Sequence, residues 1–195
     1  MASVVLLYGA GSGALHAVTG PDHVLSLGPA ALQRSRAPWK IGLFWGAGHA
    51  LGTLLLAIPA LLAAELVQLE QLAAVGQRAA GLALMAMAVW SWLTLRRSAG
   101  TGRPDARSPL LVGLVHGASG AGSLLLVLPV LASGSLERTL LFLAAFAVGS
   151  TASMAGLTSL IARLGTKLKA ATLTRVQVIL THASFAFGCF LLAFG

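Results

Sequence analysis

The sequence predicts an all-α membrane protein, a polytopic bundle of six transmembrane helices that forms a single domain over residues 1–195. Three observations predict it. Of the 195 residues, 57% are hydrophobic and only 9% are charged, whereas a soluble domain carries roughly a quarter charged residues. The apolar residues gather in stretches long enough to cross a hydrocarbon core about 30 Å thick. The basic residues gather in every second connection between those stretches.

The predicted spans follow from these apolar stretches, and they cover residues 4–32, 40–64, 74–95, 109–133, 139–163 and 172–194. The first is longer than one straight crossing requires, and Gly20-Pro21 lies inside it. Proline removes a backbone donor and disturbs the preceding turn. We therefore expect the first helix to be broken at that dipeptide.

The basic residues predict the orientation of the chain. Eleven of the thirteen lie in the connections after the first, third and fifth spans, and the opposite side has Arg78 and Arg138. Short, positively charged loops remain in the cytoplasm. We therefore predict a multi-pass protein of the cell (inner) membrane with loops 1, 3 and 5 cytoplasmic and both termini non-cytoplasmic. The same loops account for the net charge of +8, so no nucleic-acid partner is expected. The eleven are Arg34, Arg36, Lys40, Arg96, Arg97, Arg103, Arg107, Arg163, Lys167, Lys169 and Arg175.

A shift of about 100 residues matches the two halves of the chain, about 1–97 and 107–195, on either side of the loop at 97–108. It places His16 over His116, Thr19 over Ser119, Gly20 over Gly120 and Pro29 over Pro129. Each half has three predicted spans, an odd number, so the halves would be inverted relative to each other. Such 3+3 inverted repeats with interrupted helices recur in transporters, whose substrate site lies where the repeats meet.

The segment from His16 to His23 carries the strongest chemical signal. Asp22 is the only acidic residue well inside an apolar stretch, and a carboxylate at the bilayer centre costs about 2.5–3.5 kcal/mol on insertion scales. The spacing of His16 and His23 puts both on one face of a helix, with Thr19 between them. Imidazole with carboxylate and carbonyl oxygen suits nickel, cobalt or zinc, and magnesium poorly. The alternative is that Asp22 pairs with a histidine and only stabilises the bundle.

Three further polar residues extend this candidate site. His49 lies one turn beyond Gly46 on a face of small residues that permits close helix packing, so we expect it in the interior as a fourth metal ligand. His116 is an additional ligand or a hydrogen-bond donor to one, with Ser119 beside it in the repeat. For His49 the alternative is a hydrogen-bonded packing residue, and for His182 that alternative is preferred.

The residues of the first two spans resemble a known family. The His-x5-Asp-His sequence of residues 16–23 is similar to the first motif of the HupE/UreJ nickel transporters, and residues 42–49 resemble the Gly-x-x-Phe-Ser-x-Gly-His motif of the nickel/cobalt permeases. The resemblance implies membership of the nickel/cobalt transporter superfamily. It implies that His16, Asp22, His23 and His49 handle the metal.

We therefore expect a secondary transporter of a divalent transition-metal cation, nickel or cobalt first, rather than an enzyme. The expected partners are the metal ion, the lipid bilayer, and further copies of the chain or metalloenzyme-maturation proteins, with no cofactor beyond the transported ion. Two alternatives are a membrane-embedded substrate-binding subunit of an ATP-driven transporter and a non-transporting accessory protein of metalloenzyme maturation. The single Cys189 excludes a CxxC redox pair and a cysteine zinc site within the chain.

Overall fold

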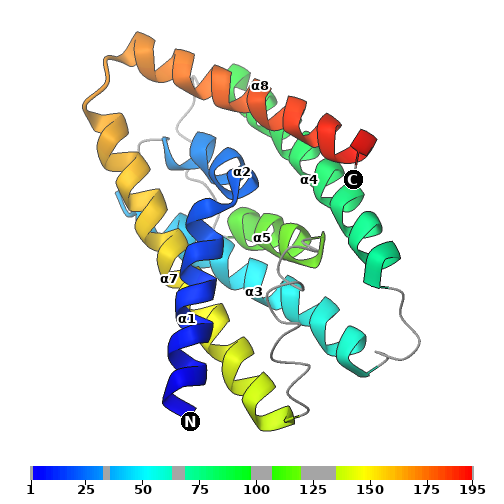
Figure 1. The fold of residues 1–195 in the computed structure, drawn as a ribbon. Helices are drawn as coiled ribbons and strands as arrows, with labels where there is room; N and C mark the ends of the chain where they lie inside the picture. The colour runs from blue at the N-terminus through cyan, green and yellow to red at the C-terminus, as the bar shows by residue number, and fades with distance from the viewer. Residues whose placement is uncertain (1, 33–35, 63–68, 98–106, 120–134, 195) are drawn as a thin grey trace.

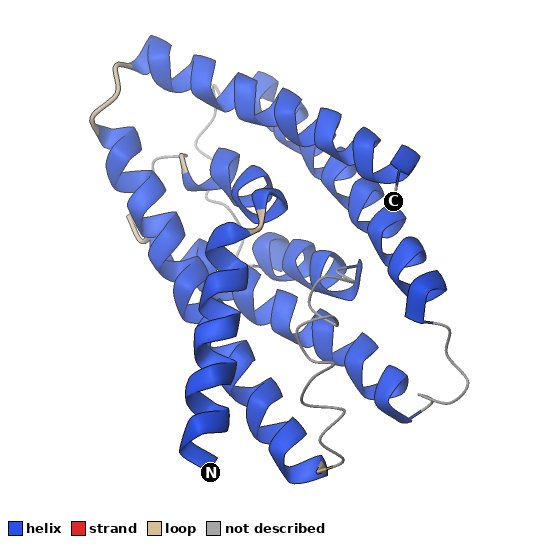
Figure 2. Ribbon diagram, in the orientation of Figure 1, coloured by secondary structure: helices blue, strands red, loops and turns tan. Residues whose placement is uncertain are grey.

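The computed structural model describes residues 2–32, 36–62, 69–97, 107–119 and 135–194. Within this part of the chain every regular element is a helix, which confirms the predicted all-α class (Figure 2). The helices are α1 (Ala2–Thr19), α2 (Pro21–Ala31), α3 (Pro38–Leu62), α4 (Leu69–Arg97), α5 (Arg107–Ser119), α7 (Leu136–Thr166) and α8 (Ala170–Phe194).

The helices pack mainly in pairs that are distant in sequence (Figure 1). Helix α1 lies along α7, α3 packs against both α5 and α7, and α4 lies along α8. The short α2 sits among them and contacts α8, α4, α7 and α3. This places the break between α1 and α2 close to α3 and α5 inside the bundle.

Local sequence explains where two of the helices begin. Pro21 opens α2, a position where its missing N–H leaves no intrahelical bond unmade. Ser135 caps α7 because its side chain accepts a hydrogen bond from the Arg138 N–H, at 3.4 Å. The break predicted at Gly20-Pro21 is therefore confirmed, and it divides the first predicted span into two separate helices.

The central apolar cluster joins α1, α2, α3 and α7. It consists of fully or almost fully buried side chains from all four helices, and Val112 of α5 packs against it. This cluster fixes the relative positions of the helices that carry the candidate site described below. Its members are Ala17, Leu27, Ile41, Trp45 and Met154.

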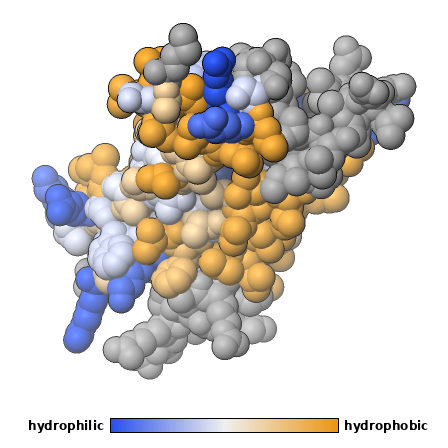
Figure 3. All heavy atoms as spheres, turned by 90° about the horizontal axis from the view of Figure 1, so that it is seen from below, coloured by the Kyte–Doolittle hydropathy of each residue, from blue (hydrophilic) through white to orange (hydrophobic). Residues whose placement is uncertain are grey.

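The outer surface carries many large apolar side chains (Figure 3). Val4, Leu7, Val148, Ile179 and Phe194 are all more than half exposed. An apolar surface of this extent is typical of contact with lipid rather than water. Three of the described helices, α1, α7 and α8, are long and apolar enough to cross a membrane. The chain is therefore a membrane protein with apolar transmembrane helices.

The described residues support only part of the predicted six-span, 3+3 architecture. Helices α3 and α4 follow the second and third predicted spans and have 25 and 29 residues. The fourth predicted span, 109–133, is described only as far as the end of α5, so Gly120 and Pro129 lie outside the described residues. Three candidate spans among the described helices, rather than six, are what length and composition support.

Candidate metal centre

The site begins at the break between α1 and α2. The last turn of α1 closes with the Gly20 N–H donating to the His16 carbonyl, and α2 starts with the His23 N–H donating to the Gly20 carbonyl, both at 3.1 Å. Gly20 itself is extended, with φ −69° and ψ 110°. The change of direction sets the imidazoles of His16 and His23 edge to face, with ring centroids 4.7 Å apart.

The expectation that helical spacing puts His16 and His23 on one face is wrong, because α1 ends between them. The two rings meet across the break instead. Thr19 does not join them: it is exposed, and its hydroxyl donates to the Leu15 carbonyl at 2.8 Å. The two imidazoles are therefore neighbours, as expected, but for a different structural reason.

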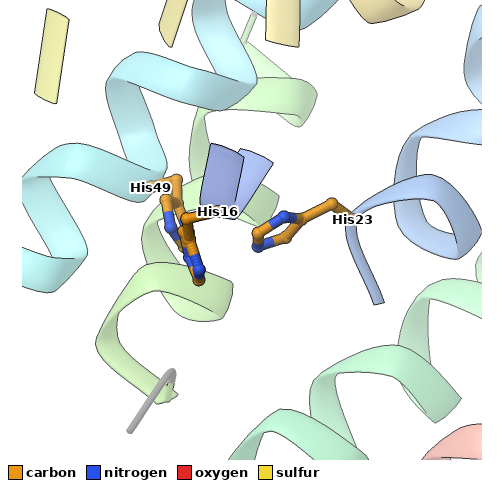
Figure 4. A group of neighbouring side chains, drawn as sticks. All are labelled: His16, His23 and His49. Carbon is orange, nitrogen blue, oxygen red and sulfur yellow. The ribbon is translucent and has the colours of Figure 1, made fainter. Parts of the chain in front are cut away.

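His49 of α3 completes a group of three imidazoles (Figure 4). Its ring stacks on that of His16 at 5.6 Å and meets that of His23 at 5.1 Å. One ring nitrogen from each of the three lies within 4.8 Å of the others, a spacing compatible with a shared metal ion. His49 is 1% exposed, so its predicted place in the interior is confirmed.

Asp22 and His116 form the other side of the site. The Nε2–H of His116, in α5, donates to Asp22 Oδ2 at 2.9 Å, and His23 Nε2 lies 3.9 Å from the same oxygen. The ligand atoms of Asp22, His23 and His116 again lie within 4.8 Å of one another. His116, which the repeat indicated only as an additional ligand or donor, is therefore in direct contact with the carboxylate.

The hydrogen bonds of the ring nitrogens favour a ligand role for two of these histidines. His23 Nδ1–H donates to the Ala17 carbonyl at 3.2 Å, which leaves the lone pair on Nε2. Neither that Nε2 nor either nitrogen of His49 has a hydrogen-bond partner among the described residues. Buried polar atoms are rarely left in this state, and a missing ion is one of the standard explanations.

Trp45 forms a wall of the site, and sequence reasoning missed it. Its indole stacks on His49 at 5.2 Å with an interplanar angle of 9°, and its centroid lies 5.4 Å from that of His23 and 5.3 Å from that of His116. It is 1% exposed. The signal was available: Trp45 precedes His49 by four residues, so both lie on one face of α3.

Ser119 and His182 were also considered in the sequence analysis. Ser119 ends α5, and its side chain is outside the described part of the chain. His182 of α8 is exposed rather than interior, and its Nδ1–H donates to the Val178 carbonyl at 2.8 Å. His182 therefore satisfies its hydrogen bond locally, as expected of a residue with no ligand role.

The donor set fits a divalent transition metal. Four imidazoles and one carboxylate come from α1, α2, α3 and α5, and their ligand atoms form two neighbouring groups that share His23. Imidazole suits zinc, copper, iron and nickel, whereas magnesium and calcium prefer sites made only of oxygen ligands.

Comparison with known proteins gives two relatives from Arabidopsis thaliana. Chloroplast protein FOR GROWTH AND FERTILITY 2 is 30% identical over 194 residues, which cover 89% of this chain and 50% of the relative. Chloroplast protein FOR GROWTH AND FERTILITY 1 is 27% identical over 181 residues, which cover 81% and 49%. The chain thus spans about half the length of the curated relatives it matches. No family model matches the chain, and no solved structure matches it significantly.

These comparisons correct one expectation and support another only in part. The relatives are chloroplast proteins named for growth and fertility, and no family model supports the nickel/cobalt transporter superfamily, so that predicted membership is wrong. The predicted location is supported only as far as a membrane. The cell (inner) membrane itself is not supported, because the relatives are named as chloroplast proteins. What stands is a helical membrane protein that is similar to these two chloroplast proteins over most of its length.

Proposed function

We propose that this chain is a secondary transporter that carries a divalent transition-metal cation across a membrane. The observation that carries the proposal is the cluster of His16, Asp22, His23, His49 and His116 at a helix break in the interior of an apolar bundle. Ionisable residues at such a depth are expensive and usually mark an ion pathway. The buried, unpartnered nitrogens of His23 and His49 add to that expectation.

The cargo follows from the ligands. Imidazoles outnumber the carboxylate, which favours nickel, cobalt and zinc over magnesium, calcium and manganese. Nickel, cobalt and zinc are therefore the candidate cargoes. Because ligand type alone does not separate these three metals, the geometry that the moving helices impose would have to select among them.

Paired glycine contacts support an inverted repeat around this site. A methyl group on Gly13 of α1 would collide with the Phe146 carbonyl of α7, and one on Gly113 of α5 would collide with the Trp45 carbonyl of α3. Gly113 follows Gly13 by 100 residues and Phe146 follows Trp45 by 101. The α1–α7 and α3–α5 contacts are thus equivalent under the shift that relates the halves, as two interlocked inverted repeats require.

The same pattern recurs one turn away. A methyl group on Gly149 of α7 would collide with the Ala10 carbonyl, and one on Gly48 of α3 would collide with the Leu110 carbonyl. Here too the equivalent residues are related by the shift: Leu110 follows Ala10 by 100 residues, and Gly149 follows Gly48 by 101. In the proposed mechanism the two halves rock about the metal site, and the close glycine contacts guide that movement.

We propose the membrane topology from the charges. The cytoplasmic side, or its organellar equivalent, would hold loops 1, 3 and 5, and both termini would lie opposite. The exposed Arg163, Lys167 and Lys169 around the α7–α8 connection fit this arrangement. Both relatives are named as chloroplast proteins, so a chloroplast-type membrane is one proposed setting for the activity.

The test is metal flux into proteoliposomes for nickel, cobalt, zinc and manganese. We expect uptake of at least one of nickel, cobalt and zinc by the wild-type chain and at least a ~10-fold loss in Asp22→Asn and His23→Ala, since each variant removes a ligand of the proposed site. His182→Ala is the matched control, because its imidazole lies outside the cluster. Well-folded wild-type protein that moves none of the four metals would exclude a self-sufficient transporter.

A further inference from the structure

The ligand atoms of the candidate centre fall into two groups that share a single residue. One group is His16, His23 and His49, and the other is Asp22, His23 and His116. Within each group the ligand atoms lie within 4.8 Å of one another. Metal–nitrogen and metal–oxygen bonds of about 2.0–2.2 Å place two ligands of one ion at most about 4.4 Å apart. Small movements would therefore close either group around an ion.

His23 can serve only one of the two groups at a time. Its Nδ1–H is engaged by the Ala17 carbonyl, so Nε2 provides its only lone pair for a metal. That Nε2 is 1% exposed with the rest of the ring and lies 3.9 Å from Asp22 Oδ2. A single lone pair binds one ion, so the two groups exclude each other as simultaneous sites.

The groups also differ in charge and in the part of the chain they join. The first has three neutral imidazoles, all from α1, α2 and α3. The second includes a carboxylate and links Asp22 of α2 to His116 of α5, whose Nε2–H and Oδ2 are hydrogen-bonded at 2.9 Å. An ion in the second position would replace this direct bond between the two halves of the chain, and His116 would coordinate it through whichever ring nitrogen then carries no proton.

We infer, on the basis of the transport function proposed above, that the centre is a two-position relay for one ion. The ion is held first by one group and then by the other, and it remains bound to His23 Nε2 during the exchange. The all-imidazole position lies within the N-terminal half. The carboxylate position spans both halves, so the exchange couples the ion's movement to the Asp22–His116 contact.

The experiment is Co²⁺ binding to the purified full chain in detergent, followed by metal analysis of bound ion and by the visible absorption spectrum of the Co²⁺. The variants are His49→Ala, His116→Ala, the double variant and His23→Ala, with His182→Ala as the control. Thermal unfolding of each variant shows that it is folded. Co²⁺ flux is measured in parallel in proteoliposomes.

We expect one Co²⁺ per wild-type chain. His49→Ala and His116→Ala should each still bind one ion, with Co²⁺ spectra that differ from each other, and each should lower flux at least ~10-fold. The double variant and His23→Ala should bind none.

Two Co²⁺ ions per wild-type chain, or loss of binding in both single variants, would overturn the relay. In the second case a wild-type chain that still transports Co²⁺ would leave the proposed function standing with one undivided site. A wild-type chain that neither binds nor moves any metal would overturn both proposals.

Discussion

The buried ring nitrogens are the features that most need a chemical explanation. His49 has two of them without a hydrogen-bond partner among the described residues, and His23 has one. Leaving a polar group buried and unsatisfied costs about 1–3 kcal/mol. Two apolar residues of similar volume would avoid that cost, so a purely structural role for these side chains is disfavoured. A metal ion would bind the lone pair of His23 Nε2 and that of one His49 nitrogen, so it would account for two of the three unpartnered nitrogens.

Trp45 contacts three of the histidines, so in the proposed centre it would affect metal affinity without supplying a ligand. Its indole contacts the rings of His49, His23 and His116. We expect Trp45→Leu to weaken Co²⁺ binding about 10-fold, the lower end of what loss of a supporting contact costs a metal site. Trp45→Phe should restore much of the affinity, since it keeps a planar surface against His49.

The measurement is a Co²⁺ titration followed by absorption. Trp39→Leu is the control, because Trp39 lies at the start of the same helix and is 47% exposed. Equal affinity of Trp45→Leu and wild type would show that the indole only fills space.

The site could be predicted from sequence only in part. His16, Asp22, His23 and His49 were identifiable because polar residues are conspicuous in apolar stretches. The contact of Asp22 with His116 joins residues 94 apart in the chain, and local periodicity carries no information about it. Helical periodicity also gave one wrong prediction, because it placed Thr19 with the histidines. The helix ends at Thr19, and that side chain is exposed.

The break between α1 and α2 is what converts two short apolar helices into a binding site. Pro21 stops the α1 hydrogen-bond ladder, and Gly20 fits where a side chain would not. A Cβ added to Gly20 would lie 2.5 Å from His23 Nδ1 and 2.8 Å from Asp22 Oδ1. The φ and ψ of Gly20 are accessible to any residue, so its small size rather than its backbone freedom is required.

Gly20→Ala should therefore damage the centre and leave the helices intact. The new methyl group would displace His23 and Asp22, and we expect at least a ~10-fold loss of Co²⁺ affinity, equivalent to about 1.4 kcal/mol. Gly11→Ala is the matched control in α1, because a Cβ there meets nothing within 4 Å. Circular dichroism should show the same helix content in both variants. Unchanged Co²⁺ affinity in Gly20→Ala would show that the side chains around the break can shift without cost.

At the scale of the whole molecule, composition and periodicity predicted the class of fold and most helix positions. The predicted spans at 139–163 and 172–194 correspond to α7 (Leu136–Thr166) and α8 (Ala170–Phe194). The pairing of helices was harder to predict, because it depends on backbone contacts at glycines such as Gly13 and Gly113. Those contacts are set by three-dimensional shape, and a hydropathy pattern records only which stretches are apolar.

The proposed topology can be tested directly by the accessibility of introduced cysteines. With five crossings between them, the N-terminus and the α7–α8 connection must lie on opposite sides of the membrane. In a Cys189→Ser background, Ala2→Cys should react with an impermeant maleimide in intact cells that carry the chain in their plasma membrane. Lys167→Cys should react only after permeabilisation, since Lys167 is exposed but would face the cytoplasm.

The cysteine-free chain is the control for background labelling. If only Lys167→Cys reacts in intact cells, the number of crossings is still odd but the orientation is the reverse of the proposed one. That result would show that these basic loops do not set the orientation. Reaction of both cysteines in intact cells would require an even number of crossings between them. The two halves could then not be inverted as three-span repeats, and the rocking movement proposed for the metal site would lose its structural basis.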